Sequence, residues 1–140
     1  MGTIEVFDHT ADVGLRVRAS TIDDLFRTSA EGLFDYIVAN REAVRVERVD
    51  ALSLRAGSPT DLLADWLAEL IFRSETDHRL YTRFDVRVAP DGLSLEAEIG
   101  GEPIDRDRHV LDHEVKAVTR HGLSLRREGA GWVAELILDI

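Results

Sequence analysis

Hydrophobic and polar residues alternate near the start of the chain. Apolar side chains occupy every second position from residue 13 to residue 19, with glycine or arginine between them. A period of two is typical of a half-buried strand. Thr21 and Asp24 are spaced like a helix cap, and apolar residues recur after them at helical spacing: Leu25, Phe26, Ala30, Leu33, Phe34, Ile37 and Val38. The pattern predicts a strand followed by a helix that ends near Asn40.

A second helix is predicted after Gly57. Ser58 is a favourable N-cap, Pro59 suits the first helical position, and Asp61 follows the cap by three residues. Apolar residues then recur at helical spacing: Leu62, Leu63, Trp66, Leu67, Leu70 and Ile71.

Extended segments account for most of the remaining chain. Residues 44–54 mix β-branched and charged side chains, with a break near Arg48 that a β-bulge would repair. Two hairpins are predicted from turn-forming triplets: residues 81–89 and 93–99 flank Pro90-Asp91-Gly92, and residues 115–127 and 132–139 flank Gly129-Ala130-Gly131.

These elements predict one α+β domain over residues 1–140, with two main helices packed on antiparallel or mixed β-sheet layers. The chain is 44% hydrophobic and 31% charged, which suits one globular domain of 140 residues with its own core. Its net charge of -10 argues against independent nucleic-acid binding, because affinity for phosphate backbones comes mainly from clustered lysine and arginine.

The sequence also favours a cytoplasmic location. It contains no cysteine, which fits a reducing compartment. We expect neither a secretory signal nor a membrane span, because the N-terminus lacks a basic and apolar leader and no apolar run approaches about 18 residues.

Candidate chemistry lies at the two ends of the sequence. Asp12, within the segment His9-Thr10-Ala11-Asp12-Val13-Gly14, and Asp139 supply side-chain carboxylates, and Ile140 supplies a terminal one. Such oxygen donors suit hard cations such as calcium or magnesium, whereas structural zinc sites prefer nitrogen and sulfur. The alternative is that Asp12 only accepts local backbone hydrogen bonds and that Asp139 is solvated.

Other polar clusters have simpler explanations. Asp61, Asp65 and Glu69 recur every four residues and so line one face of the second predicted helix, usually a solvated surface unless it meets the cation site or a basic partner. His109 and His113 are spaced like a zinc pair, but Ala117 stands where a zinc-protease motif needs its second histidine. Local hydrogen bonds within a polar loop are the expectation for both histidines.

Lys116 is the only lysine, and its alternation places it on a polar strand face. The sequence contains no motif for a catalytic serine, a phosphate-binding loop or a dinucleotide site. These absences weaken enzyme hypotheses.

Three blocks together resemble the archease family over nearly the whole chain. They are the segment around Asp12, the segment Leu62-Leu63-Ala64-Asp65-Trp66-Leu67-Ala68-Glu69-Leu70, and Glu114-Val115-Lys116-Ala117-Val118-Thr119 before a final Asp-Ile. Arg120 departs from the family pattern, which often has an aromatic residue there.

The resemblance implies an accessory protein, not itself an enzyme, of the tRNA-splicing RNA ligase RtcB. Such a protein promotes guanylylation of the ligase by GTP and its multiple turnover. The resemblance also implies a bound divalent cation that is held by Asp12, Asp139 and Ile140. The cation is usually calcium, with magnesium or manganese as alternatives. Asp12 and Lys116 are implied in activation, and His9, Asp65 and Glu69 are further candidates for the site.

Two other classes of function stay open. A general chaperone or protein-binding module would use the acidic surface for basic clients and the metal as a structural brace. A metal-dependent phosphohydrolase would use the cation to activate water, but the sequence offers no convincing base for it.

Overall fold

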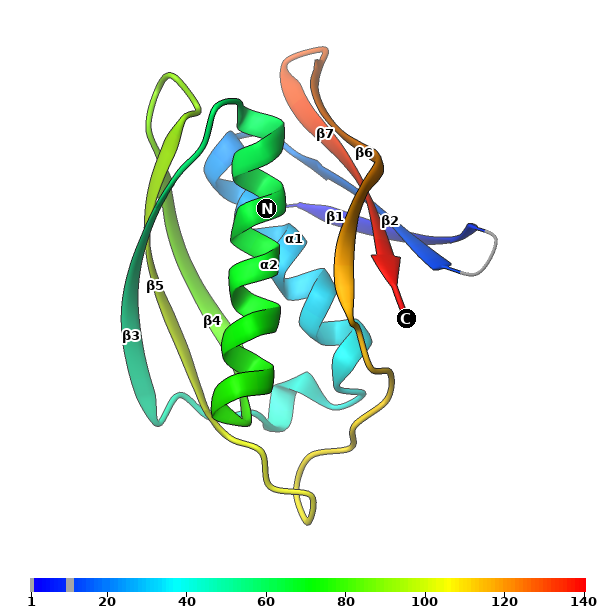
Figure 1. The fold of residues 1–140 in the computed structure, drawn as a ribbon, viewed down its shortest axis with the longest axis vertical. Coiled ribbons are helices and arrows are strands. Elements are labelled where there is room, and N and C mark those ends of the chain that lie inside the picture. The colour runs from blue at the N-terminus through cyan, green and yellow to red at the C-terminus, as the bar shows by residue number, and fades with distance from the viewer. Residues whose placement is uncertain (1, 10–11) are drawn as a thin grey trace.

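The computed structural model describes residues 2–9 and 12–140, with the backbone alone considered at residues 8 and 9. It is an α+β fold of two helices and two antiparallel sheets, as predicted (Figure 1). The elements in chain order are β1 (Thr3–His9), β2 (Asp12–Ala19), α1 (Ile22–Ile37), the 3₁₀ helix η1 (Arg41–Ala43), β3 (Arg48–Arg55), α2 (Pro59–Asp77), β4 (Arg79–Val88), β5 (Ser94–Pro103), β6 (Ala117–Glu128) and β7 (Gly131–Asp139).

The two helices lie between the two sheets (Figure 1). One sheet has four strands in the order β1-β2-β7-β6, and the other has three in the order β3-β5-β4. α1 packs on β2 and β4, while α2 packs on β6 and on the three-stranded sheet. Each sheet therefore buries one face against the helices.

Capping residues fix where both helices begin. The Thr21 hydroxyl accepts a hydrogen bond from the Asp24 backbone N–H at 3.1 Å, and the Ser58 hydroxyl accepts one from the Asp61 N–H at the same distance. α2 ends at Asp77, and the capping residue after it, His78, has a left-handed backbone with a φ of 53°. The predicted starts of both helices are confirmed.

Aromatic residues fill the centre of the core between the sheets. The Phe34 ring stacks on Phe84 with centroids 5.7 Å apart and meets the edge of Tyr81 at 5.9 Å. Trp66 is fully buried, and its indole N–H donates to the Phe26 carbonyl oxygen at 3.0 Å. This hydrogen bond joins α2 to α1 and satisfies the one polar atom of the indole.

The predicted strand over residues 44–54 begins too early. β3 starts at Arg48, and its register with β5 continues to Arg55 without the predicted bulge. The preceding residues are held by main-chain and side-chain contacts: the Glu47 N–H donates to the Gly101 carbonyl oxygen of β5 at 3.0 Å, the Arg45 N–H donates to Glu102, and Arg108 donates to the Ala43 carbonyl oxygen at 3.1 Å. The observed irregularities lie in β4, between Tyr81 and Arg83, and in β6, between Thr119 and Ser124.

Both predicted hairpins are confirmed with somewhat different ends. β5 continues to Pro103, because its last residues still pair with Arg79 and Leu80 at the start of β4. β1 was not predicted as a strand, although it pairs with β2 along its whole length. None of the helices in the described part of the chain is long and apolar enough to cross a membrane.

Candidate functional site

The candidate residues from the two ends of the sequence meet at one end of the four-stranded sheet. Val13 of β2 pairs with Leu138 of β7, so Asp12 and Asp139 are the next residues at the same end of this strand pair. Asp12 also pairs with His9 of β1. Antiparallel pairing thus brings together residues that are far apart in the sequence.

Lys116 reaches the same end of the sheet from the neighbouring strand. Ala117, the first residue of β6, pairs with Asp139, and the Lys116 backbone N–H donates to the Asp139 carbonyl oxygen at 2.8 Å. Lys116 is exposed, and Ile140 keeps 40% of its surface accessible. The lysine and the final residues are therefore open to a partner at this position.

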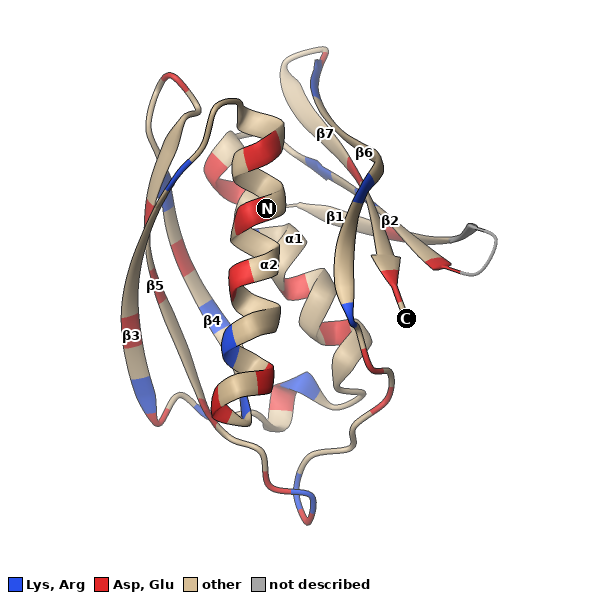
Figure 2. Ribbon diagram, in the orientation of Figure 1, with Lys and Arg blue, Asp and Glu red and all other residues tan. Residues whose placement is uncertain are grey.

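Strand alternation decides which way the two carboxylates point. Leu15 and Leu136 pair with each other and are buried against the helices. Asp12 and Asp139 occupy the opposite phase of their strands, so their side chains lie on the sheet face away from the helices, where both are half-buried. Figure 2 shows acidic segments at these ends of β2 and β7.

Packing on the same outer face holds β1 against β2. A Cβ atom at Gly14 would lie 2.3 Å from the Phe7 ring, so the glycine provides the space in which this ring lies. The Arg16 guanidinium lies over the ring, 4.8 Å from its centroid, and makes ion pairs with Glu5 and Glu135. The hydrogen bond to Glu135 raises the pKa of Arg16 despite the opposing effect of burial.

The donor set at this end of the sheet suits a hard cation only in part. Asp12 and Asp139 supply two carboxylates, and the main-chain oxygens of Ile140 are the third donor group. Among residues 2–7 and 12–140, no three His, Cys, Asp or Glu side chains are grouped to hold a metal ion. Thr10 and Ala11 of the motif, and the His9 side chain, lie outside what is described.

The acidic stripe on α2 is paired with arginines. Arg120 of β6 donates to Asp61 at 2.6 Å and to Asp65 at 3.0 Å. Glu69 accepts from Arg73, one helical turn on, at 2.7 Å. The stripe therefore meets basic residues of this chain itself, and the structure does not group Asp65 or Glu69 with the Asp12–Asp139 pair.

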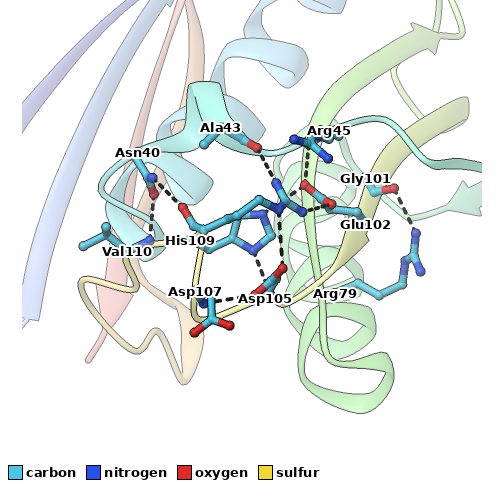
Figure 3. Close-up of polar contacts among 11 residues, drawn as sticks. Asn40, Ala43, Arg45, Arg79, Gly101, Glu102, Asp105, Asp107, His109 and Val110 are labelled. Carbon is cyan, nitrogen blue, oxygen red and sulfur yellow. Dashed lines mark hydrogen bonds and ion pairs between the residues drawn. The ribbon is translucent and has the colours of Figure 1, made fainter.

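A buried polar cluster was missed by the sequence analysis (Figure 3). Glu102, at the end of β5, accepts hydrogen bonds from the Arg108 side chain and from the Arg45 backbone N–H, the latter at 2.6 Å. The His109 Nε2 atom lies 3.0 Å from Glu102, and its Nδ1 atom accepts from the Asp105 N–H at 2.9 Å. Because Nδ1 is an acceptor, Nε2 carries the proton and donates to the carboxylate.

The local hydrogen bond expected of His109 is thus confirmed, while its burial and its carboxylate partner were not foreseen. Burial alone would raise the pKa of Glu102, but hydrogen bonds from Arg108, Arg45 and His109 outweigh it and lower the pKa to about 2. The His109 side chain is fully buried. The cluster fixes the segment over residues 104–115, which leads directly to Lys116.

The other histidine of that segment also makes a local contact. The His113 ring stacks on Tyr36, with centroids 4.1 Å apart and planes 10° from parallel. Its Nδ1 atom lies 3.3 Å from the Tyr36 carbonyl oxygen. The two histidines therefore have separate partners and do not form a metal pair.

Comparison with known proteins matches almost the entire chain. The model of the Archease protein family (MTH1598/TM1083) covers residues 4–140. A protein archease of Methanopyrus kandleri is 39% identical over 138 residues, covering 97% of this chain and 98% of its own. A protein archease of Pyrococcus abyssi is 31% identical, covering 97% of both chains.

Solved structures agree with this assignment. The solution structure of Methanobacterium thermoautotrophicum protein 1598 superimposes with a TM-score of 0.80 at 28% identity, covering 98% of both chains. A Thermotoga maritima structure described as an archease and possible chaperone gives a TM-score of 0.66 at 14% identity over 96% of this chain and 94% of its own, a likeness of fold alone. The chain, with its Asp12 and Lys116 segments at one end of a shared sheet, therefore belongs to the archease family.

Proposed function

We propose that this protein is an activator of an RtcB-type RNA ligase that promotes GTP-dependent guanylylation of the ligase and its multiple turnover in tRNA splicing and RNA repair. The supporting observation is that Asp12, Asp139 and Lys116 come together at one exposed end of a sheet. The resemblance to the family implies a role in activation for Asp12 and Lys116, and a role in holding the cation for Asp12 and Asp139. Because the sequence contains no nucleophile motif, we propose an accessory role and not an enzymatic one.

Asp12, Asp139 and the main-chain oxygens of Ile140 would hold a divalent cation, with calcium the first candidate and magnesium or manganese the alternatives. When bound, the cation would supply positive charge that offsets the repulsion between these carboxylates. Lys116 adds a second positive charge near the same place. It would steady phosphate oxygens or a ligase carboxylate during nucleotidyl transfer, where neutralising charge is the main requirement.

The partner in this proposal is the ligase and not RNA. A net charge of -10 disfavours direct contact with a phosphate backbone and favours contact with a basic protein. An activator that serves many ligase molecules has to dissociate after acting, so we expect a small polar interface. We place this encounter in the cytoplasm.

The test counts ligation products per ligase molecule. The protein is mixed with the ligase of its own organism, GTP and a divalent metal, and product is followed after the first turnover. We expect product to exceed one per ligase molecule only when the protein is present. Equal product with and without it would refute the activator proposal.

A general chaperone is the second candidate, because the acidic surface of a chain with a net charge of -10 would suit basic clients. This function would show as reduced aggregation of unrelated heated proteins at substoichiometric amounts. The activator proposal predicts no such protection.

A further inference from the structure

A groove separates the C-terminal half of α2 from the segment that follows β5. Its cavity is about 590 Å³. Six apolar side chains form its floor: Ile37, Ile71, Leu80, Ile104, Leu111 and Val115. The floor could accept one or two large apolar side chains of a partner.

The groove is preformed by main-chain hydrogen bonds. The Ile104 N–H donates to the His78 carbonyl oxygen at 2.9 Å, and the Asp112 N–H donates to the Ile37 carbonyl oxygen at 2.8 Å. Leu111 forms an isolated β-bridge with Val38. Together with the buried Glu102 cluster, these contacts fix the outer wall in place, so a partner would not have to order it.

The rim of the groove is mainly acidic. Glu75, Asp112 and Glu114 line it, against a single arginine, Arg106. Glu75 and Glu114 are exposed, and neither has an ion pair with any residue that the structure describes. Phe72, three residues before Glu75 on α2, keeps 61% of its surface exposed. An apolar floor and unpaired carboxylates are complementary to a basic segment with an apolar anchor, and the Phe72 ring adds exposed apolar surface on the same helix.

We propose that this groove is the docking site for a segment of the ligase that carries a large apolar side chain flanked by lysine or arginine. This inference rests on the proposed function, because it takes the ligase as the partner. An enzyme that holds RNA carries basic surface for the phosphate backbone, and the acidic rim is complementary to such a surface. Val115 lines the groove and precedes Lys116, so docking here would bring the lysine to the ligase.

The test measures binding and turnover on the same variants. The double variant Glu75→Lys/Glu114→Lys reverses the rim charge, and Leu111→Trp fills the groove. Glu96→Lys/Glu98→Lys is the matched control, since it makes the same change in net charge on exposed positions of β5 that do not line the groove. We expect the two groove variants to weaken ligase binding about tenfold and the control to change it by less than about twofold.

Each result has a separate meaning. If wild type raises turnover and the groove variants bind as tightly as wild type, the docking proposal is wrong and the activator proposal stands. If wild type binds without raising turnover and the groove variants lose binding, docking stands and activation fails. If the wild type neither binds the ligase nor raises its turnover, the docking proposal and the activator proposal are both wrong. Sedimentation tests a further outcome. If the wild type is a dimer and the rim variant is a monomer, the occupant of the groove is a second copy of this chain, and docking of the ligase is wrong.

Discussion

Replacing the buried carboxylate by an amide, Glu102→Gln, is the most informative test of how the segment before Lys116 is held. The side chain is 3% exposed and accepts hydrogen bonds from Arg108, from His109 and from the Arg45 backbone. Glutamine removes the charge and turns an NH₂ group toward at least one of these donors. Breaking a buried charge-assisted cluster of this kind costs about 3 kcal/mol of unfolding free energy.

The same contacts predict how the stability depends on pH. The Glu102 pKa of about 2, against 4.5 for a free carboxyl, corresponds to about 3 kcal/mol. Because the pKa is lower in the folded protein, this stabilisation is complete above pH 4.5 and is lost as the pH falls toward 2. The stability difference between wild type and Glu102→Gln should therefore shrink over that interval.

Urea unfolding followed by tryptophan fluorescence measures this difference at a series of pH values. A loss of about 3 kcal/mol moves the urea midpoint by about 1 to 3 M at neutral pH. Glu98→Gln, an exposed carboxylate on the same strand, is the control and should cost less than about 0.5 kcal/mol. A difference that stays constant down to pH 2, or a Glu102→Gln protein as stable as wild type at neutral pH, would refute the reasoning.

Three further substitutions test how local contacts support the fold. Ser58→Ala removes the N-cap of α2 and should lower the unfolding free energy by about 1 kcal/mol in urea titrations. Trp66→Phe leaves the Phe26 carbonyl without its indole donor, and calorimetry should show a loss of about 1 to 3 kcal/mol. Gly14→Ala puts a methyl group where the Phe7 ring lies, so hydrogen exchange should show faster exchange in β1 while the helices stay protected. Unchanged exchange in β1 would show that Phe7 does not hold this strand in place.

The helices were predictable because their signals are local. Ser58 and Pro59 mark the start of α2, and apolar residues at helical spacing follow them directly. Both hairpins were predictable for a similar reason, since a turn-forming triplet joins strands that are adjacent in sequence. Cap and turn chemistry can be recognised within a few residues and needs no knowledge of the rest of the fold.

The pairing of β2 with β7 could not be obtained in this way. Nothing near Val13 specifies Leu138 as its partner, because the pairing depends on which faces the helices cover. The meeting of Asp12 with Asp139 was therefore a hypothesis from their donor chemistry and from the resemblance until the register placed them together. β1 was missed because its apolar residues do not share one phase of a strand: Ile4 and Val6 have one phase and Phe7 has the other.

Glu102 was overlooked for a different physical reason. In the sequence it continues an alternation of glutamates along β5 whose other members, Glu96 and Glu98, are exposed. Its burial depends on Arg108 and His109, which lie beyond the end of the strand and turn back over it. A carboxylate in such a pattern is usually exposed, and only the tertiary structure identifies the exception.

The most direct test of the central claim measures how far GTP guanylylates the ligase in the presence of variants of this protein. The variants change residues at the two ends of the four-stranded sheet. Asp12→Asn and Lys116→Ala change the candidate end, while Arg18→Ala and Glu128→Gln change an exposed ion pair near the other end. We predict that the first two variants lose stimulation while remaining folded by circular dichroism, and that the last two stimulate like wild type. Full stimulation by Asp12→Asn and Lys116→Ala would contradict the assignment of this end of the sheet as the activating site.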